Sequence, residues 1–406
     1  MTRCPGTSGP LFLLLWLFLS AGHPLLGQSA VQSEAEPLTR WEFAGVPALT
    51  YNSDEGFGYG AVMEMYKYGG AEQHPYLLTI RPKIYMTTKG RRDVTVFFDA
   101  PHLLPTGWRI DVFVGSKRQI ATPYYGVGNR TGYDPALEED PNPYYYRFER
   151  IRRSVNVNLQ RKVGDLPLRI LVGIGVSSVG ILSVPEDSGT TLLHQEIAQG
   201  RSAPEGWFNS ARLGLVWDTR DRETGPRRGA WTDVLVQRID ENLEGDWNYT
   251  RWTITDRRYF SPTRRLTLAN RFLLQDVSGN APFHELHRIQ SSFEQKEGLG
   301  GEATVRGMLR NRYTGKGLFI WNLEARWRVL DWSGFGRDFH AVVTGFVDSG
   351  RVWADGLRVK QLFTDLHHGA GAGLRIGMGE NFIVAVDAAR GDEAGIQIYT
   401  GLGYLF

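Results

Sequence analysis

Residues 321–329 read Trp-Asn-Leu-Glu-Ala-Arg-Trp-Arg-Val, so that apolar and polar side chains alternate without a break. The odd positions, from Trp321 to Val329, are apolar, and the even positions, from Asn322 to Arg328, are polar or charged. A period of two residues is typical of a β-strand, whose successive side chains point to opposite faces. Charges fall in the middle of this strand, so we expect it to have one apolar and one polar face along its whole length.

The same alternation recurs along most of the chain in segments separated by turns. Many segments are longer than the five or six residues of a typical strand. Counting them gives about sixteen strands, an even number such as bacterial membrane barrels have. We place them at 43–51, 56–68, 76–87, 92–100, 107–118, 144–161, 167–180, 207–218, 229–240, 246–260, 265–277, 317–330, 338–353, 368–378, 382–390 and 395–406.

Periodicity alone does not separate a soluble sheet, with its apolar face inward, from a barrel whose apolar face meets lipid. Aromatic residues gather near the ends of predicted strands, for example at 144–146 and 259–260, as a membrane-interface belt requires. Short turns also alternate with long segments between strands, of which 278–316 is the longest. The sequence therefore predicts an all-β fold, a transmembrane antiparallel β-barrel, with a soluble exported β-protein as the alternative.

The first residues differ in composition from the rest of the chain. Arg3 precedes an apolar run from Leu11 to Ala21, and small or polar residues follow, which is the pattern of a secretory signal peptide. We predict a signal peptide over 1–27, a short periplasmic segment over 28–42 and the barrel over 43–406. The one cysteine, Cys4, lies in the signal, so the processed chain has no disulfide, cysteine metal site or thiol nucleophile.

Sequence motifs for catalysis or metal binding are weak. No Ser/His/Asp set and no paired carboxylates indicate catalysis, so we predict that the chain is not an enzyme and needs no cofactor or metal. His284 and His287 are three residues apart, which is not the metalloprotease spacing, and we expect both to be solvated in an external loop. We expect no nucleic-acid partner.

The C-terminal half carries an ordered series of short motifs. They are 305–308 (Val-Arg-Gly-Met), 322–326 (Asn-Leu-Glu-Ala-Arg), 346–350 (Phe-Val-Asp-Ser-Gly), 371–375 (Gly-Ala-Gly-Leu-Arg) and 401–406 (Gly-Leu-Gly-Tyr-Leu-Phe). Upstream, Asp218-Thr-Arg-Asp221 precedes Pro226-Arg-Arg-Gly229. In this order the set resembles the bacterial surface antigen superfamily of outer-membrane barrels. That superfamily includes the central subunit of the barrel-assembly machine, its translocation-module relative and two-partner secretion transporters.

The resemblance implies that the loop between predicted strands 11 and 12 folds into the barrel, with Arg306 and Gly307 at its tip. It also implies that Arg306 pairs with Glu324 and Asp348. Both acids fall on the polar parity of their strands, and a charge in a partly dry lumen needs a partner. The alternative is that each is a solvated lumen charge. Family members often have an aromatic residue at the position of Met308, so its packing is an open point.

The seam between the first and last strands has its own composition. The first strand contains Gly45 and Pro47, and the last contains Gly395, Gly401 and Gly403, residues that weaken strand pairing. Family members open at this seam to admit substrate strands. The alternative is that Pro47 starts the strand and the glycines pack under aromatic rings.

The C-terminus ends in an aromatic pair. The resemblance implies that Tyr404 and Phe406 form the insertion signal. Parity puts them on a lipid-facing stripe together with Ile396, Ile398 and Leu402.

Three functions fit these patterns. The first is insertion or translocation of polypeptide, or lipid, at the outer membrane through a lateral seam. The second is a passive solute pore, and the third is a structural barrel that scaffolds a periplasmic partner, because polypeptide-transport-associated domains common in the superfamily are absent from the sequence. Expected partners are outer-membrane lipids and lipopolysaccharide, the barrel-assembly machinery during the chain's own insertion, and a periplasmic protein. The expected location is the bacterial outer membrane.

Overall fold

The computed structural model describes residues 41–52, 56–69, 75–104, 107–139, 142–183, 189–200, 205–292, 295–334, 336–379 and 381–406. The predicted signal peptide over 1–27 and residues 28–40 of the predicted periplasmic segment lie outside these ranges. Residues 41 and 42 already belong to the first strand, two residues before the predicted start of the barrel.

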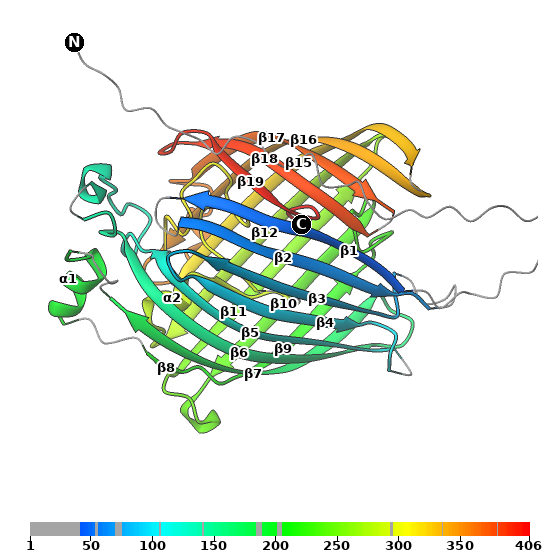
Figure 1. Ribbon diagram of the computed structural model, residues 1–406. Helices are drawn as coiled ribbons and strands as arrows, with labels where there is room; N and C mark the ends of the chain where they lie inside the picture. The colour runs from blue at the N-terminus through cyan, green and yellow to red at the C-terminus, as the bar shows by residue number, and fades with distance from the viewer. Residues whose placement is uncertain are drawn as a thin grey trace, which may run out of the picture.

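One antiparallel sheet of 17 strands forms the molecule, and Figure 1 shows it rolled into a barrel. Its strands are β1 (Trp41–Asn52), β2 (Gly56–Lys67), β3 (Leu78–Thr87), β4 (Arg92–Ala100), β5 (Trp108–Pro123), β6 (Arg147–Lys162), β7 (Leu168–Leu182), β8 (Gly206–Trp207), β9 (Ser210–Asp218), β10 (Gly229–Ile239), β11 (Tyr249–Phe260), β12 (Leu266–Gly279), β15 (Gly317–Gly334), β16 (Arg337–Trp353), β17 (His367–Met378), β18 (Phe382–Gly391) and β19 (Gln397–Leu402). Apart from the two-residue β8, the strands correspond to the sixteen predicted segments.

The remaining elements are short and lie in the connections. Between β12 and β15 a helix, α2 (Phe283–Leu286), precedes a hairpin of β13 (Arg288–Ile289) and β14 (Lys296–Glu297). The others are α1 (Leu192–Ala198), η1 (Pro135–Glu138), η2 (Glu241–Leu243) and η3 (Val359–Gln361). No helix in the described part of the chain is long and apolar enough to cross a membrane.

The faces of the sheet have the polarity of a membrane barrel. On β7 the alternate residues Ile170, Val172, Ile174 and Val176 are exposed, which places apolar side chains on the outer surface. On β11 the residues that face inward include Arg251, which is completely buried. An apolar exterior around a polar interior is the arrangement that lipid requires and water does not. The predicted fold class is confirmed.

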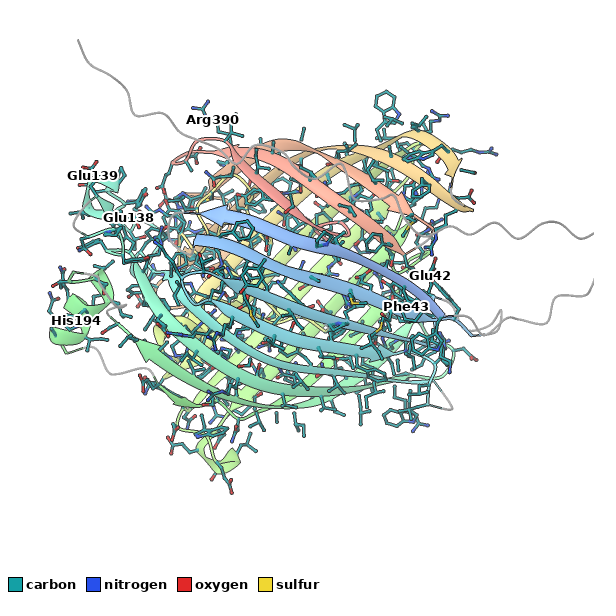
Figure 2. The ribbon with its side chains drawn as sticks, in the orientation of Figure 1. Glu42, Phe43, Glu138, Glu139, His194 and Arg390 are labelled. Carbon is teal, nitrogen blue, oxygen red and sulfur yellow. The ribbon has the colours of Figure 1, made fainter. Side chains whose placement is uncertain are left out.

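The connections divide between the two ends of the barrel. Short turns join β6 to β7 and β11 to β12 at one end, and the long connections 124–146 and 280–316 leave from the other end. Figure 2 shows the labelled start of β1, at Glu42, at the end opposite to Glu138 and His194 of the long connections. In an outer-membrane barrel the long loops are external, so β1 begins and β19 ends on the periplasmic side.

The C-terminus departs from the sequence prediction. β19 ends at Leu402, and Gly403 has a φ of +76°, a conformation that favours glycine and turns the chain. Tyr404 lies with its ring centroid 4.1 Å from the guanidinium carbon of Arg326, and the backbone carbonyl of Phe406 accepts a 2.8 Å hydrogen bond from the same side chain. The prediction that Tyr404 and Phe406 face lipid is wrong, because the chain turns at Gly403 and both rings lie against the lumen cation Arg326.

Candidate functional site

The connection 280–316, named the inserted loop below, folds into the barrel from its external end. It is anchored by its own small core, in which Ile289, Leu299 and Val305 pack against Leu318 and Val352 of the wall. The two histidines expected to be solvated are buried here: His284 is fully buried and His287 is nearly so. That expectation is wrong because the loop folds into the lumen and carries both rings with it.

Arg306 lies at the tip of the inserted loop and is almost fully buried. Its guanidinium is 2.7 Å from Asp348 and 2.8 Å from Glu324, the two acids implied by the resemblance. The backbone N–H of Arg306 also donates to Asp348 at 3.1 Å. Beneath the guanidinium lies the ring of Phe346, with 3.4 Å between the guanidinium carbon and the ring centroid.

This cluster contains a third carboxylate, which sequence reasoning missed. Asp387 of β18 lies 3.1 Å from Arg306 and 2.6 Å from Arg375 of β17. The sequence could have indicated this residue, because Asp387 is the one charged residue between Phe382 and Ala389 and its position in the alternation faces the lumen. The cluster therefore joins the loop to β15, β16 and β18 together.

Two glycines allow the loop tip to approach the wall. A Cβ on Gly369 would lie 1.8 Å from the carbonyl oxygen of Arg306, and a Cβ on Gly307 would lie 2.4 Å from the backbone of Arg390. Gly307 also has a φ of +92°, and its N–H donates to the hydroxyl of Tyr399 at 3.0 Å. Met308 is buried in the loop core, which answers the open point about its packing.

A second polar cluster anchors the beginning of the inserted loop to the opposite wall. Glu285 of α2 pairs with Arg152 of β6, lies 3.4 Å from Arg251 of β11 and accepts a hydrogen bond from the hydroxyl of Tyr249 at 2.7 Å. Arg288 of the loop is 3.8 Å away. Sequence reasoning did not identify Glu285, because no motif marks a short helix inside a long loop.

The charges of the loop respond to these surroundings. Burial acts to raise the pKa of Glu285, but the neighbouring arginines outweigh it and hold that pKa well below its usual value. For Arg306, burial acts to lower the pKa, but Asp348, Glu324 and Asp387 outweigh it and raise that pKa. Burial lowers the pKa of His287 to about 3, so this ring is neutral at physiological pH.

The periplasmic turn between β9 and β10 also reaches inward. Glu223 lies 2.8 Å from Arg109, which in turn is 2.6 Å from Asp99. A Cβ on Gly225 would lie 3.1 Å from the ring of Tyr404, so this turn rests against the C-terminal tail. The segment 218–229, noted as a motif in the sequence, thus reaches into the periplasmic end of the lumen.

The two edges of the sheet are β1 and β19. β1 pairs with β2 and β19 pairs with β18, and within the described residues no ladder joins β1 to β19. Near the start of β1, side chains connect the two ends of the sheet: Glu42 lies 3.0 Å from Arg337, and Tyr68 accepts a 3.0 Å hydrogen bond from Asn381.

The predicted seam residues occupy different positions along these edges. Gly45 and Pro47 lie inside β1, opposite Met63 and Ala61, so the alternative that Pro47 starts the strand is wrong. Gly401 lies in β19, whereas Gly395 precedes that strand and Gly403 follows it. The prediction that all three glycines belong to the last strand is wrong, because the strand is shorter than its alternation suggested. A Cβ on any of the three would meet no described atom within 4 Å, so they do not pack under aromatic rings.

Within the described ranges, no three or more His, Cys, Asp or Glu side chains are grouped so that they could hold a metal ion. The clusters around Arg306 and Glu285 pair opposite charges and present no free nucleophile. The arrangement can hold a loop in the lumen and leave two strand edges available for backbone pairing.

Comparisons with known proteins agree with this geometry. A search of curated proteins finds no match. Among solved structures, BamA from Haemophilus ducreyi lacking POTRA domains 1–3 is 12% identical with a TM-score of 0.54, covering 90% of this chain and 70% of that one. CdiB from Escherichia coli is 11% identical with a TM-score of 0.57, covering 90% of this chain and 62% of that one, so the chain spans less than two thirds of the length of CdiB. At these identities the likeness shows the fold.

The family model of the Omp85 superfamily domain matches residues 82–406, from the third strand to the last residue. The ordered motifs and the inserted loop lie within this match, and the resemblance read from the sequence is confirmed. The chain belongs to the Omp85 superfamily of outer-membrane β-barrels.

Proposed function

We propose that this barrel assists the insertion of polypeptide into the outer membrane, or its translocation across it, through a lateral seam between β1 and β19. The observation that carries the proposal is the pair of strand edges, on β1 and β19, that no ladder joins within the described residues. Each edge strand offers backbone N–H and C=O groups to an incoming strand, which is how β-augmentation binds a peptide. The work is non-covalent, and no catalytic residue is part of it.

The occupied lumen supports this function over a passive pore. The inserted loop is held by buried ion pairs on two sides of the lumen, at Arg306 and at Glu285. From the periplasmic side, the turn with Glu223 and the C-terminal tail narrow the other end. A solute pore needs no such obstruction, whereas a barrel that works at its seam tolerates a filled centre.

Sequence composition supports the same seam. Pro47 removes one ladder donor from the middle of β1, and Gly401 weakens the C-terminal end of β19. Side-chain contacts such as Glu42–Arg337 connect the two ends of the sheet without a continuous ladder. Contacts of this kind separate more readily than a row of backbone hydrogen bonds does.

The experiment that tests this function locks the seam. Cysteines replace Val46 and Gly401, which share the lumen parity of β1 and β19, and a short bis-maleimide joins the two thiols in membranes. The matched control places cysteines at Val62 and Lys83, which are register partners on the paired strands β2 and β3 and face the same side of the sheet. We expect the β1–β19 crosslink to abolish complementation of a deletion strain and the control crosslink to leave it intact.

Full complementation by the locked protein would contradict a lateral seam. If in addition the deletion strain lost only uptake of small solutes, the passive pore would be the better account. Co-purification of a periplasmic protein that is needed for complementation, with the locked barrel still active, would favour the scaffold.

A further inference from the structure

The inserted loop lies between lumen walls of opposite charge. On the side of β15, β16 and β18, three carboxylates, Glu324, Asp348 and Asp387, surround the loop cation Arg306. On the side of β5, β6 and β11 the external half of the wall is basic, and its lumen-facing cations are Lys117, Arg150, Arg152 and Arg251. The loop supplies a charge of the opposite sign to each wall: a cation to the acidic wall and carboxylates to the basic wall.

The loop carboxylates on the basic wall are Glu285 and Glu297. Glu285 pairs with Arg152 and lies 3.4 Å from Arg251, and Glu297 lies 2.6 Å from Arg150. Among the described residues, the carboxylates that pair with Arg150, Arg152 and Arg251 all belong to the loop. In the part of the barrel that the structure describes, the wall therefore supplies no carboxylate that pairs with these three side chains.

Both glutamates belong to one compact unit of the loop. Glu297 is the partner of Arg288 in the hairpin of β13 and β14, and Glu285 lies in the short helix that leads into that hairpin. The basic wall thus receives two carboxylates from a single folded piece of polypeptide. Buried cations without counter-ions are costly, so departure of this piece would leave the wall ready for another acid.

We propose that the basic wall of β5, β6 and β11 is a binding site for an acidic polypeptide segment, and that Glu285 and Glu297 of the inserted loop occupy it as an internal mimic. The inference rests on the proposed function, because the segment would belong to the polypeptide that the barrel handles. Carboxylates spaced along a strand or hairpin would pair with Arg150, Arg152 and Arg251 as the loop glutamates do. The loop then competes with the client for the same cations.

The observations favour a polypeptide over a lipid phosphate as the ligand. The groups now bound are carboxylates, and Arg251 also donates to the backbone carbonyl of Glu285 at 2.5 Å, a contact that a peptide backbone offers and a phosphate group does not. Tyr249 donates its hydroxyl to the same carboxylate. Residues of the wall thus bind both the carboxylate and the backbone carbonyl of Glu285.

The test measures binding of a fluorescent oligoglutamate peptide to the full chain in detergent micelles at low salt. Glu285→Gln combined with Glu297→Gln removes the charges of the mimic, and we expect oligoglutamate to bind about tenfold more tightly than to the parent. Glu302→Gln is the matched control, since it removes the same charge from an exposed residue of the same loop, and it should leave the affinity unchanged. Adding Arg150→Gln and Arg152→Gln should abolish the gain.

Heat-modifiable migration in gels verifies that each variant is folded. Because the double variant could unfold the loop, a second measurement uses the parent: oligoglutamate should increase proteolytic cleavage of residues 280–316, and oligolysine should not. Three results would overturn the inference: equal binding of oligoglutamate to parent and double variant, a gain that survives loss of the two arginines, or competition by lipopolysaccharide with no binding of oligoglutamate. None of them bears on the seam lock, so the proposed function would stand or fall separately.

Discussion

At the scale of single residues, the barrel interior is organised by arginines with carboxylate partners. Arg306 is buried among three acids, and its guanidinium also covers the ring of Phe346. An arginine suits this place because its forked donors satisfy two carboxylates at once and it stays charged when buried. Removing one member of such a cluster leaves its partners as uncompensated charges, which costs more than the pair contributes.

We therefore predict that Arg306→Ala lowers the free energy of unfolding by about 3–5 kcal/mol, because Asp348, Glu324 and Asp387 lose their common cation. Denaturant titration in lipid vesicles measures the change. The control is Arg130→Ala, which breaks the exposed pair with Asp365 and should cost less than about 1 kcal/mol. Equal losses in the two variants would contradict the role of burial.

His287 gives a pH dependence with a definite sign. The unfolded chain protonates this histidine near pH 6.5, whereas burial lowers its folded-state pKa to about 3. The unfolded state therefore binds more protons as the pH falls below 6.5, and stability decreases down to about pH 3. We predict that this residue costs about 2 kcal/mol between pH 7 and pH 5.

The measurement compares unfolding of the parent and of His287→Gln at the two pH values. The variant should lose less stability on acidification than the parent does, and His194→Gln on the exposed helix α1 serves as control. A parent and a His287 variant with the same pH dependence would show that the ring is not held neutral.

At the scale of elements, the inserted loop is joined to the wall by close backbone contact as well as by charge. Gly369 lies in β17 directly beneath the carbonyl of Arg306. Gly345 on β16 has open space around it and is its natural counterpart. The two glycines separate the effect of contact with the loop from the general effect of alanine in a strand.

We predict that Gly369→Ala displaces the loop tip and lowers the free energy of unfolding by about 1–3 kcal/mol, as overpacking does. Gly345→Ala should leave stability unchanged or raise it slightly, since alanine favours a strand more than glycine does. Limited proteolysis of residues 280–316 reports the displacement directly. Protection of the loop in Gly369→Ala equal to that in the parent would contradict the close contact.

The strands were predictable because lipid and lumen impose a period of two on each of them. The ion pairs of Arg306 with Glu324 and Asp348 followed from motif resemblance and strand parity together. The ion pairs of Glu285 and the burial of His284 were not predictable, because a loop that folds into a lumen has no periodic pattern of apolar residues that would indicate its buried side chains. The inward turn of Tyr404 and Phe406 was missed because their alternation continues that of β19, and only contacts with distant arginines change their direction.

At the scale of the whole molecule, the barrel combines a filled lumen with two strand edges that do not pair with each other in the described structure. The inserted loop enters from the external end, and the turn with Glu223 and the C-terminal tail enter from the periplasmic end. With the centre occupied from both sides, the edges of β1 and β19 are the remaining places where another polypeptide can join the sheet.

Site-specific photocrosslinking in living cells tests this central claim most directly. A photoreactive residue replaces Phe43 on β1 or Ile398 on β19, both exposed on the outer face, and Val155 in the middle of the sheet on β6 is the control. The account predicts crosslinks to other outer-membrane polypeptides at Phe43 and Ile398 and none at Val155. Equal crosslinking at all three positions, or crosslinks to lipid alone, would contradict it.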